Sequence, residues 1–155
     1  LTVHIVGKTD KSLNDLLPDS FSPLNLKKGI RLLDPLDNKL RIDAENPDQL
    51  VTEALQAANA SYAPYSESLA GVAIKTKNGQ IFRGNYMENA AYNPSLLPLQ
   101  AALANLIIAG RKFPEIEKAV LVESKDNRFD HAGSARRLLH SISGCSLEVI
   151  EASKS

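Results

Sequence analysis

The chain has 155 residues, 43% hydrophobic and 23% charged, a composition typical of one globular domain or of one domain plus a segment of another. Lysine plus arginine equals aspartate plus glutamate at 18 each, and the only basic cluster, Lys27, Lys28 and Arg31, is too short to indicate nucleic-acid binding. The single cysteine, Cys145, excludes a disulfide framework and a metal site of several cysteines, and its apolar neighbours favour a small core residue over a nucleophile.

No segment has the pattern of a membrane span or of a secretory leader. The longest apolar run, residues 96–109, is interrupted by Gln100 and Asn105 and falls short of the roughly 20 residues that cross a bilayer. The chain does not begin with methionine, so we expect a fragment or a processed product. We expect a cytoplasmic location and no membrane partner.

The N-terminal part predicts little regular structure. Residues 1–6, LTVHIV, alternate in hydrophobicity and are rich in β-branched side chains, which predicts a strand. Residues 12–21 predict a short helical turn ended by Pro18. Residues 22–46 contain Pro, Gly, Asp and Asn and predict a loop or linker.

A helix and a hairpin follow. Asn46 can cap a helix whose first residue is Pro47 and whose third is Gln49. Apolar residues then recur at helical spacing and predict one buried face: Leu50, Val51, Ala54, Leu55 and Ala58. Residues 71–84 predict a hairpin around Asn78-Gly79, the favoured two-residue turn in which both residues have positive φ.

The remaining segments alternate between helix and strand. Residues 98–110 predict a helix that Gly110 ends and that is apolar nearly all round, hence buried in a core or an interface. Strands are predicted at 118–124 and 146–153, with a helix at 134–143 between them that Gly144 ends. From residue 46 the order is αββαβαβ, which predicts a three-layer α/β/α domain with a mixed sheet of about five strands.

Residues 61–94, SYAPYSESLAGVAIKTKNGQIFRGNYMENAAYNP, resemble the cytidine deaminase family. That family typically has S-Y-x-P-Y-S, then V-G-A, a hairpin that ends in Gly, and N-x-E-N-A-S-Y. Each fragment alone is weak, but their order and spacing together are specific. The resemblance covers residues 46–151 and implies the family's αββαβαβ domain.

The resemblance also implies which positions carry the chemistry. In the family, one Cys or His and two Cys hold Zn²⁺, whose bound water attacks C4 of a pyrimidine, while a glutamate two residues after the first ligand moves protons. These positions are Leu97 for the first ligand, Leu99 for the glutamate, and Ala132 and Ala135 for the remaining ligands. The resemblance therefore implies a degenerate site, with no catalytic residue, metal or cofactor in this chain. The alternative is that both segments are ordinary buried helices.

Other family positions are partly kept. The asparagine of N-x-E, a ribose contact, falls on Tyr86, whereas Glu88 keeps the acidic position. A lone loop glutamate is usually solvated or caps backbone N–H groups. Ala91 and Tyr92 occupy positions that, in the family, bind the pyrimidine of the neighbouring subunit across the dimer interface. The alternative for Tyr92 is a buried loop tyrosine.

The N-terminal segment extends the resemblance. Residues 15–26, DLLPDSFSPLNL, are similar to the tail that closes the family's catalytic domain. The implied organisation is a catalytic-domain tail at 1–26, a linker at 27–45 and a non-catalytic deaminase-like domain at 46–155, as in the long dimeric enzymes of enteric-type bacteria. The parent protein would deaminate cytidine and deoxycytidine in pyrimidine salvage, with zinc in its catalytic domain. The partners would be that N-terminal catalytic domain and a second subunit. A different reading is a stand-alone module that binds a nucleoside without chemistry.

The remaining polar residues predict no other site. His131 and His140 are nine residues apart, about 900° of helical rotation, and so lie on opposite helix faces. His4 is expected on the polar face of a strand. Asp34, Asp37 and Asn38 lack the spacing and the closing glutamate of a calcium loop.

Overall fold

The computed structural model describes residues 1–18, 29–91 and 93–154, which form two compact units, Leu1–Arg31 and Leu32–Ser155. In the first unit, β1 (Thr2–Val3) pairs antiparallel with β2 (Lys11–Ser12), and α1 (Leu13–Leu16) follows. The expected strand at 1–6 is thus only two residues long. No residue of α1 is buried, so its Ser12–Asp15 capping box supplies the local order.

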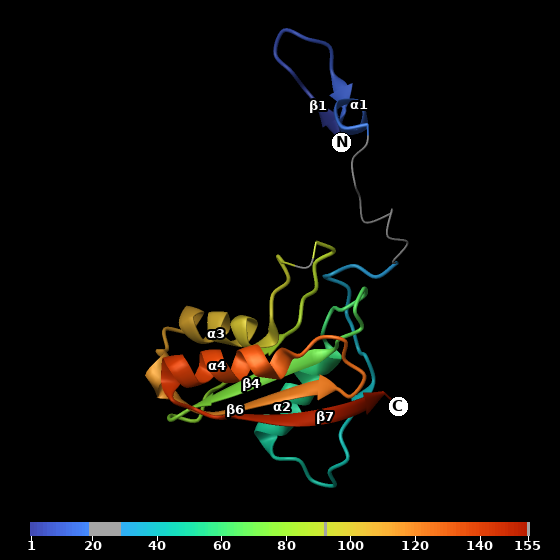
Figure 1. Cartoon of the computed structure of the whole chain (residues 1–155). Helices are drawn as coiled ribbons and strands as arrows, with labels where there is room; N and C mark the ends of the chain where they lie inside the picture. Colours follow the sequence, from blue (N-terminus) through green and yellow to red (C-terminus); the bar gives the residue numbers. More distant parts are fainter. Residues whose placement is uncertain (19–28, 92, 155) are drawn as a thin grey trace. The chain divides into compact units, whose positions relative to one another are not determined.

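The second unit contains a five-stranded mixed sheet, which confirms the predicted sheet (Figure 1). Strands β6 and β7 are parallel and the other neighbours are antiparallel. Across the sheet the order is β3 (Leu40–Arg41), β7 (Leu147–Lys154), β6 (Ile116–Ser124), β4 (Ala70–Thr76) and β5 (Ile81–Asn85). Strand β3 lies inside the segment expected as a linker.

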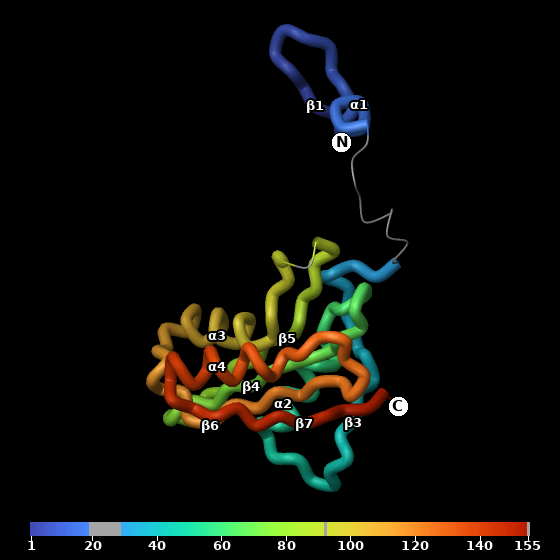
Figure 2. The backbone as a smooth tube through the Cα atoms, viewed as in Figure 1, coloured from blue at the N-terminus to red at the C-terminus, as the bar shows by residue number. Residues whose placement is uncertain are grey.

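Within the described residues, helices α2 (Gln49–Asn59), α3 (Pro98–Ile108) and α4 (His131–Ser143) cover the two faces of the sheet. A Cβ on Gly71 of β4 would meet the backbone of α2, and one on Gly84 of β5 would meet the backbone of α3. Gly71 pairs with Asn85, the neighbour of Gly84, and side chains alternate along a strand, so α2 and α3 lie on opposite faces. Helix α4 lies beside α3 (Figure 2). The domain therefore has the predicted α/β/α layers.

Two local predictions are wrong. Helix α2 begins after Asp48, whose carboxylate accepts from the Val51 N–H at 2.9 Å, so Asp48 rather than Asn46 is the N-cap. In the β4–β5 turn only Gly79 has positive φ, at 87°. The N–H of Gly79 donates to Thr76 O at 2.7 Å, which fits a three-residue loop closed by a glycine bulge instead of a two-residue turn.

Helix α3 is buried along most of its length but not at its end. Leu99, Ala102 and Leu106 are almost fully buried, whereas Ile107 and Ile108 are 54% and 83% exposed. Gly110 follows with φ of 75° and ends the segment, as predicted. Within the described residues, no helix has the length and apolar character needed to cross a membrane.

Candidate functional site

The positions that the sequence singled out come together at the N-terminal turns of α3 and α4. Leu97 is the N-cap of α3 and Leu99 is its second residue; Ala132 and Ala135 lie in the first turns of α4. Leu97, Leu99 and Ala135 line one cavity of about 170 Å³, and Ala132 is buried next to His131, a further lining residue. The cavity is lined by Val72, Leu97, Pro98, Leu99, Gln100, Leu121, His131, Ser134, Ala135 and Leu138.

The approach to α3 is fixed by backbone pairing. Met87 and Leu96 exchange both N–H···O bonds, at 3.0 and 2.9 Å, and Tyr62 forms a bridge on the other side of Met87. Leu97 then enters α3, and its N–H donates to the Gln100 side chain at 3.2 Å. The leucine therefore occupies its position at the cavity because the chain on both sides is held.

These residues do not fit a zinc ion. Zinc is bound in proteins by thiolate, imidazole or carboxylate groups, and Leu97, Ala132 and Ala135 have none. Among the residues that the structure describes, no three His, Cys, Asp or Glu side chains converge to hold a metal. Leu99 has no titratable group, so it cannot transfer a proton.

His131 is the main polar group at the cavity, although the sequence placed it only as a rejected metal-ligand partner of His140. Its side chain is 2% exposed, and Nε2 lies 3.1 Å from Ser68 O. A carbonyl oxygen only accepts, so Nε2 carries the hydrogen and Nδ1 is an acceptor. Burial lowers the pKa of His131, which keeps the ring neutral.

An aromatic cluster surrounds this histidine. The rings of Tyr86 and Phe129 lie edge-on to His131, with centroids 4.6 and 4.9 Å away. Tyr86 directly follows β5, Phe129 lies in the β6–α4 connection and His131 begins α4, so no short sequence window contains all three. The available signal was the position of His131 directly before Ala132 at a helix start.

Glu88 caps backbone groups, one of the two roles that the sequence suggested. Its carboxylate is 6% exposed and accepts from the N–H groups of Tyr65, at 2.8 Å, and Ser66, at 3.1 and 3.2 Å. These bonds use the carboxylate to hold the 65–66 turn against the strand-like segment at 87. Its role in this structure is therefore to fix a loop.

The loop with the expected substrate contact is described only in part. Ala91 is exposed, and its N–H donates to the Asn89 side chain at 2.9 Å. Tyr92 lies outside the described residues.

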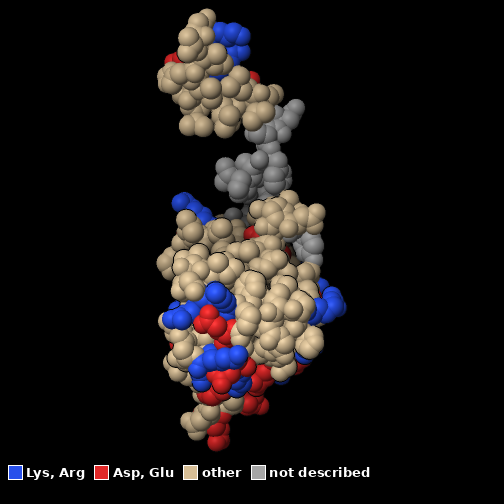
Figure 3. Space-filling view, turned by 90° about the vertical axis from the view of Figure 1, so that its left-hand side faces the viewer, with Lys and Arg blue, Asp and Glu red and all other residues tan. Residues whose placement is uncertain are grey.

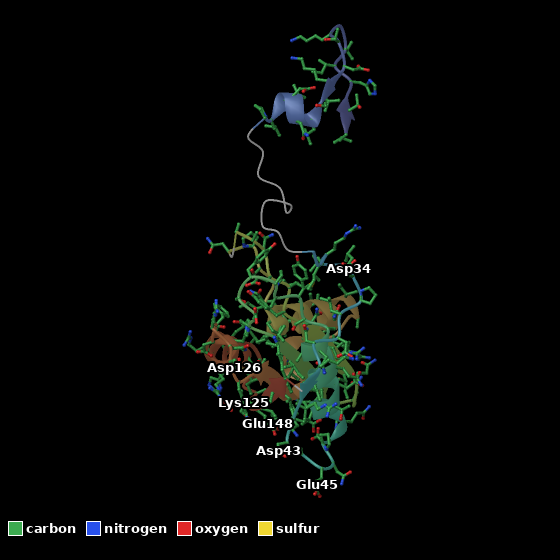
Figure 4. The ribbon with its side chains drawn as sticks, turned by 90° about the vertical axis from the view of Figure 1, so that its right-hand side faces the viewer. Asp34, Asp43, Glu45, Lys125, Asp126 and Glu148 are labelled. Atoms are coloured by element: carbon green, nitrogen blue, oxygen red, sulfur yellow. The ribbon has the colours of Figure 1, made fainter. Side chains whose placement is uncertain are left out.

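A second, charged groove lies beside β7. It measures about 470 Å³ and is lined by Ile42, Asp43, Ala44, Pro47, Asp48, Val51, Lys125, Glu148, Ile150 and Glu151. Lys118 bridges two of its acids, 2.9 Å from Asp48 and 3.4 Å from Glu148. Figure 4 shows Asp43, Glu45 and Glu148 on this face, well apart from Asp34.

The other sequence candidates have structural partners. The side-chain amide of Asn38 donates to Asn59 O at 2.9 Å and to Ser61 O at 2.8 Å. Asn38 therefore satisfies backbone carbonyl groups at the end of α2 and is not a ligand of a cation. His4 pairs with Asp10 at 2.8 Å, and His140 is exposed while His131 is buried, as the helical spacing predicts. In the view of Figure 3, basic and acidic side chains lie side by side instead of in a patch of one sign.

Comparison with known proteins gives a consistent family. Residues 13–136 match the profile described as the cytidine and deoxycytidylate deaminase zinc-binding region. The chain is 46% identical over 127 residues to a cytidine deaminase of Proteus mirabilis, which covers 82% of this chain and 42% of the relative. It is 44% identical over 146 residues to that of Photorhabdus laumondii, with 94% and 49% covered.

Solved structures agree with the sequence relatives. The crystal structure of cytidine deaminase from Burkholderia pseudomallei superposes with a TM-score of 0.58 at 28% identity, covering 66% of this chain and 82% of that one. The enzyme from Mycobacterium leprae gives 0.55 at 28%, with 68% and 87% covered. The chain spans about half the length of the curated relatives it matches but most of these shorter structures.

Proposed function

Because the chain belongs to the cytidine and deoxycytidylate deaminase family, we propose that it is the zinc-less, non-catalytic C-terminal part of a longer cytidine deaminase. The parent protein hydrolyses cytidine and deoxycytidine to uridine and deoxyuridine in pyrimidine salvage. Zinc is bound in its separate catalytic domain. This part serves dimerisation and shapes the active site of the partner subunit.

One observation carries the proposal. All four positions that the family uses for metal and proton transfer are apolar here, and Leu97, Leu99 and Ala135 line one cavity. Zinc-bound water needs ligands with lone pairs, and proton transfer needs a titratable group within hydrogen-bond reach. Empty space or unpaired polar groups at such a position would destabilise the fold. Apolar side chains such as leucine avoid both, so the fold can persist after the metal ligands are lost.

The domain division follows from the same proposal. Residues 1–26 close the catalytic domain, residues 27–45 connect, and residues 46–155 form the non-catalytic copy. The boundary between the two compact units, after Arg31, supports a connecting segment in this region. Strand β3 adds Leu40 and Arg41 of that segment to the sheet. The proposed partners are the protein's own N-terminal catalytic domain and a second subunit, whose site takes the nucleoside.

The gene itself supplies the experiment. The Photorhabdus relative is about twice the aligned length, so we expect a natural reading frame of about 300 residues. Upstream of Leu1 it should encode H-A-E and P-C-x-x-C, and the full protein should deaminate cytidine while the 155-residue chain does not. An active full-length protein without those upstream motifs contradicts the proposal. So does cytidine turnover by the chain alone that survives a chelator.

A further inference from the structure

The cavity between α3 and α4 has the size and walls of a small-molecule site. Its volume is about 170 Å³, and its floor is formed by Val72 and Leu121, which are opposite each other on β4 and β6. Gln100 and Leu138 are exposed lining residues, so the cavity is open to solvent at their side. An engineered apolar protein cavity of about 150 Å³ binds benzene. The volume therefore suits one six-membered ring.

Several polar groups that line the cavity already form hydrogen bonds within the domain. The Gln100 side chain accepts from Leu97 N–H at 3.2 Å, and His131 Nε2 bonds to Ser68 O at 3.1 Å. The Ser134 hydroxyl lies 3.4 Å from His131 O. His131 Nδ1 has no hydrogen-bond partner among the described residues, but it is buried and does not open to solvent.

This lining decides the class of ligand. The other seven lining residues are apolar: Val72, Leu97, Pro98, Leu99, Leu121, Ala135 and Leu138. A nucleoside would place ribose hydroxyls against these walls without partners, which costs free energy. An uncharged ring brings no polar group of its own that needs a partner, and the imidazole of His131 adds an aromatic neighbour for it.

We propose that this cavity is a binding site for a small, uncharged aromatic compound of about the size of benzene, and that it does not bind nucleosides. The site lies where the family's metal position falls in this chain, but it uses different chemistry. The inference rests on the volume and lining of the cavity. It holds or fails independently of the parent protein's activity.

Binding is measured with fluorobenzene by ¹⁹F NMR on the 155-residue chain, with benzene as competitor. We expect saturable line broadening that benzene reverses and that cytidine and uridine leave unchanged. At ten times the Kd, benzene should raise Tm by roughly 3 °C or more, because a ligand that binds only the folded state stabilises it. Absence of saturable binding, or displacement of fluorobenzene by cytidine, would overturn the proposal.

Variants locate the site. Ala135→Leu places three more carbons at a lining position and should weaken fluorobenzene binding at least tenfold, whereas Ala104→Leu, the same change at an exposed α3 position, should leave binding unchanged. If Ala135→Leu does not fold, Leu138→Trp at the exposed side should weaken binding in the same way. Unchanged binding in a folded variant of either kind refutes the assignment. If sedimentation shows that the chain dimerises and fluorobenzene binding disappears in the dimer, a second copy of the chain covers the cavity, and this result also overturns the proposal.

Discussion

Replacing Gly84 by alanine is expected to destabilise the second unit strongly, because β5 and α3 approach each other there without room for a side chain. A Cβ at Gly84 would lie 2.2 Å from both Pro98 O and Ala102 N, and 2.8 Å from Ala101 C. These are backbone atoms of α3, so no side-chain rotation relieves the contact. The N-terminal half of α3, which carries the cavity, must move by about 1 Å to restore van der Waals distances of roughly 3.5 Å.

The magnitude follows from that displacement. Overpacking that side chains can absorb costs about 1–3 kcal/mol, and a shift of a whole helix lies at or above the upper end. We therefore expect a loss of about 3 kcal/mol or more, which for a unit of this size lowers Tm by about 10 °C. Urea and thermal unfolding followed by circular dichroism measure both. Gly29→Ala is the matched control, since Gly29 has no positive φ and nothing within 4 Å of its Cβ, and should change Tm little. A Tm within 2 °C of the parent chain, an effect below about 1 kcal/mol, would refute the close packing of α3 on β5.

Three further predictions concern single residues. Because burial lowers the pKa of His131, the unfolded chain binds the extra proton at higher pH than the folded chain, so the free energy of unfolding should fall as pH drops below 6.5 towards the folded-state pKa. Urea unfolding at pH 7.5 and 5.5 measures this loss of stability, which should be smaller in His131→Gln. An equal loss in the variant would contradict the lowered pKa of His131. Glu88→Ala should lower the free energy of unfolding by about 2–3 kcal/mol by leaving the Tyr65 and Ser66 N–H groups without their acceptor, and an effect under 0.5 kcal/mol in the same assay would show that these bonds contribute little. In the intact parent enzyme, Tyr92→Ala should lower kcat/KM for cytidine about tenfold or more while Tyr92→Phe is mild, because ring stacking is worth about 1–3 kcal/mol per base; an unchanged kcat/KM with a lower Tm would make Tyr92 structural.

The main architecture could be predicted because its signals are local. Helices α2 and α4 show apolar residues at helical spacing. Gly110 after α3 and Gly144 after α4 have positive φ and end these two helices. Strands β6 and β7 combine Val and Ile with other apolar residues over nine and eight residues. These features depend on neighbouring residues alone, so the order of elements and the mixed sheet follow from them.

What could not be predicted depends on distant contacts or on competing local ones. Strand β3 has two residues and exists because Leu40 and Arg41 pair with Lys154 and Ser153 at the end of β7, 112 or more residues later. Asp48 replaces Asn46 as the α2 cap, since its carboxylate reaches the Val51 N–H and also pairs with Lys118. The contacts with β7 and Lys118 lie outside the segment, whereas the contact of Asp48 with Val51 is local and competes with capping by Asn46.

The candidate site divides in the same way. The sequence pointed to Leu97, Leu99, Ala132 and Ala135 through the motif spacing of the resemblance, and three of them, Leu97, Leu99 and Ala135, line one cavity. The cavity itself could not be predicted, since its floor is formed by Val72 and Leu121, which lie on β4 and β6, far from these helix starts in the chain. From the sequence, His131 could be weighed only as a metal ligand together with His140, because its partners, Ser68 and Tyr86, are far away in the chain.

The central claim is that this 155-residue chain, although it belongs to a family with a zinc-binding region, binds no zinc itself. The most direct test is the metal content of the tag-free 155-residue chain, expressed with added zinc and measured by inductively coupled plasma mass spectrometry. Leu97, Ala132 and Ala135 supply no ligand, so the account predicts far less than one zinc per chain after gel filtration. One zinc per chain, retained through gel filtration and removed only by a strong chelator, would contradict it.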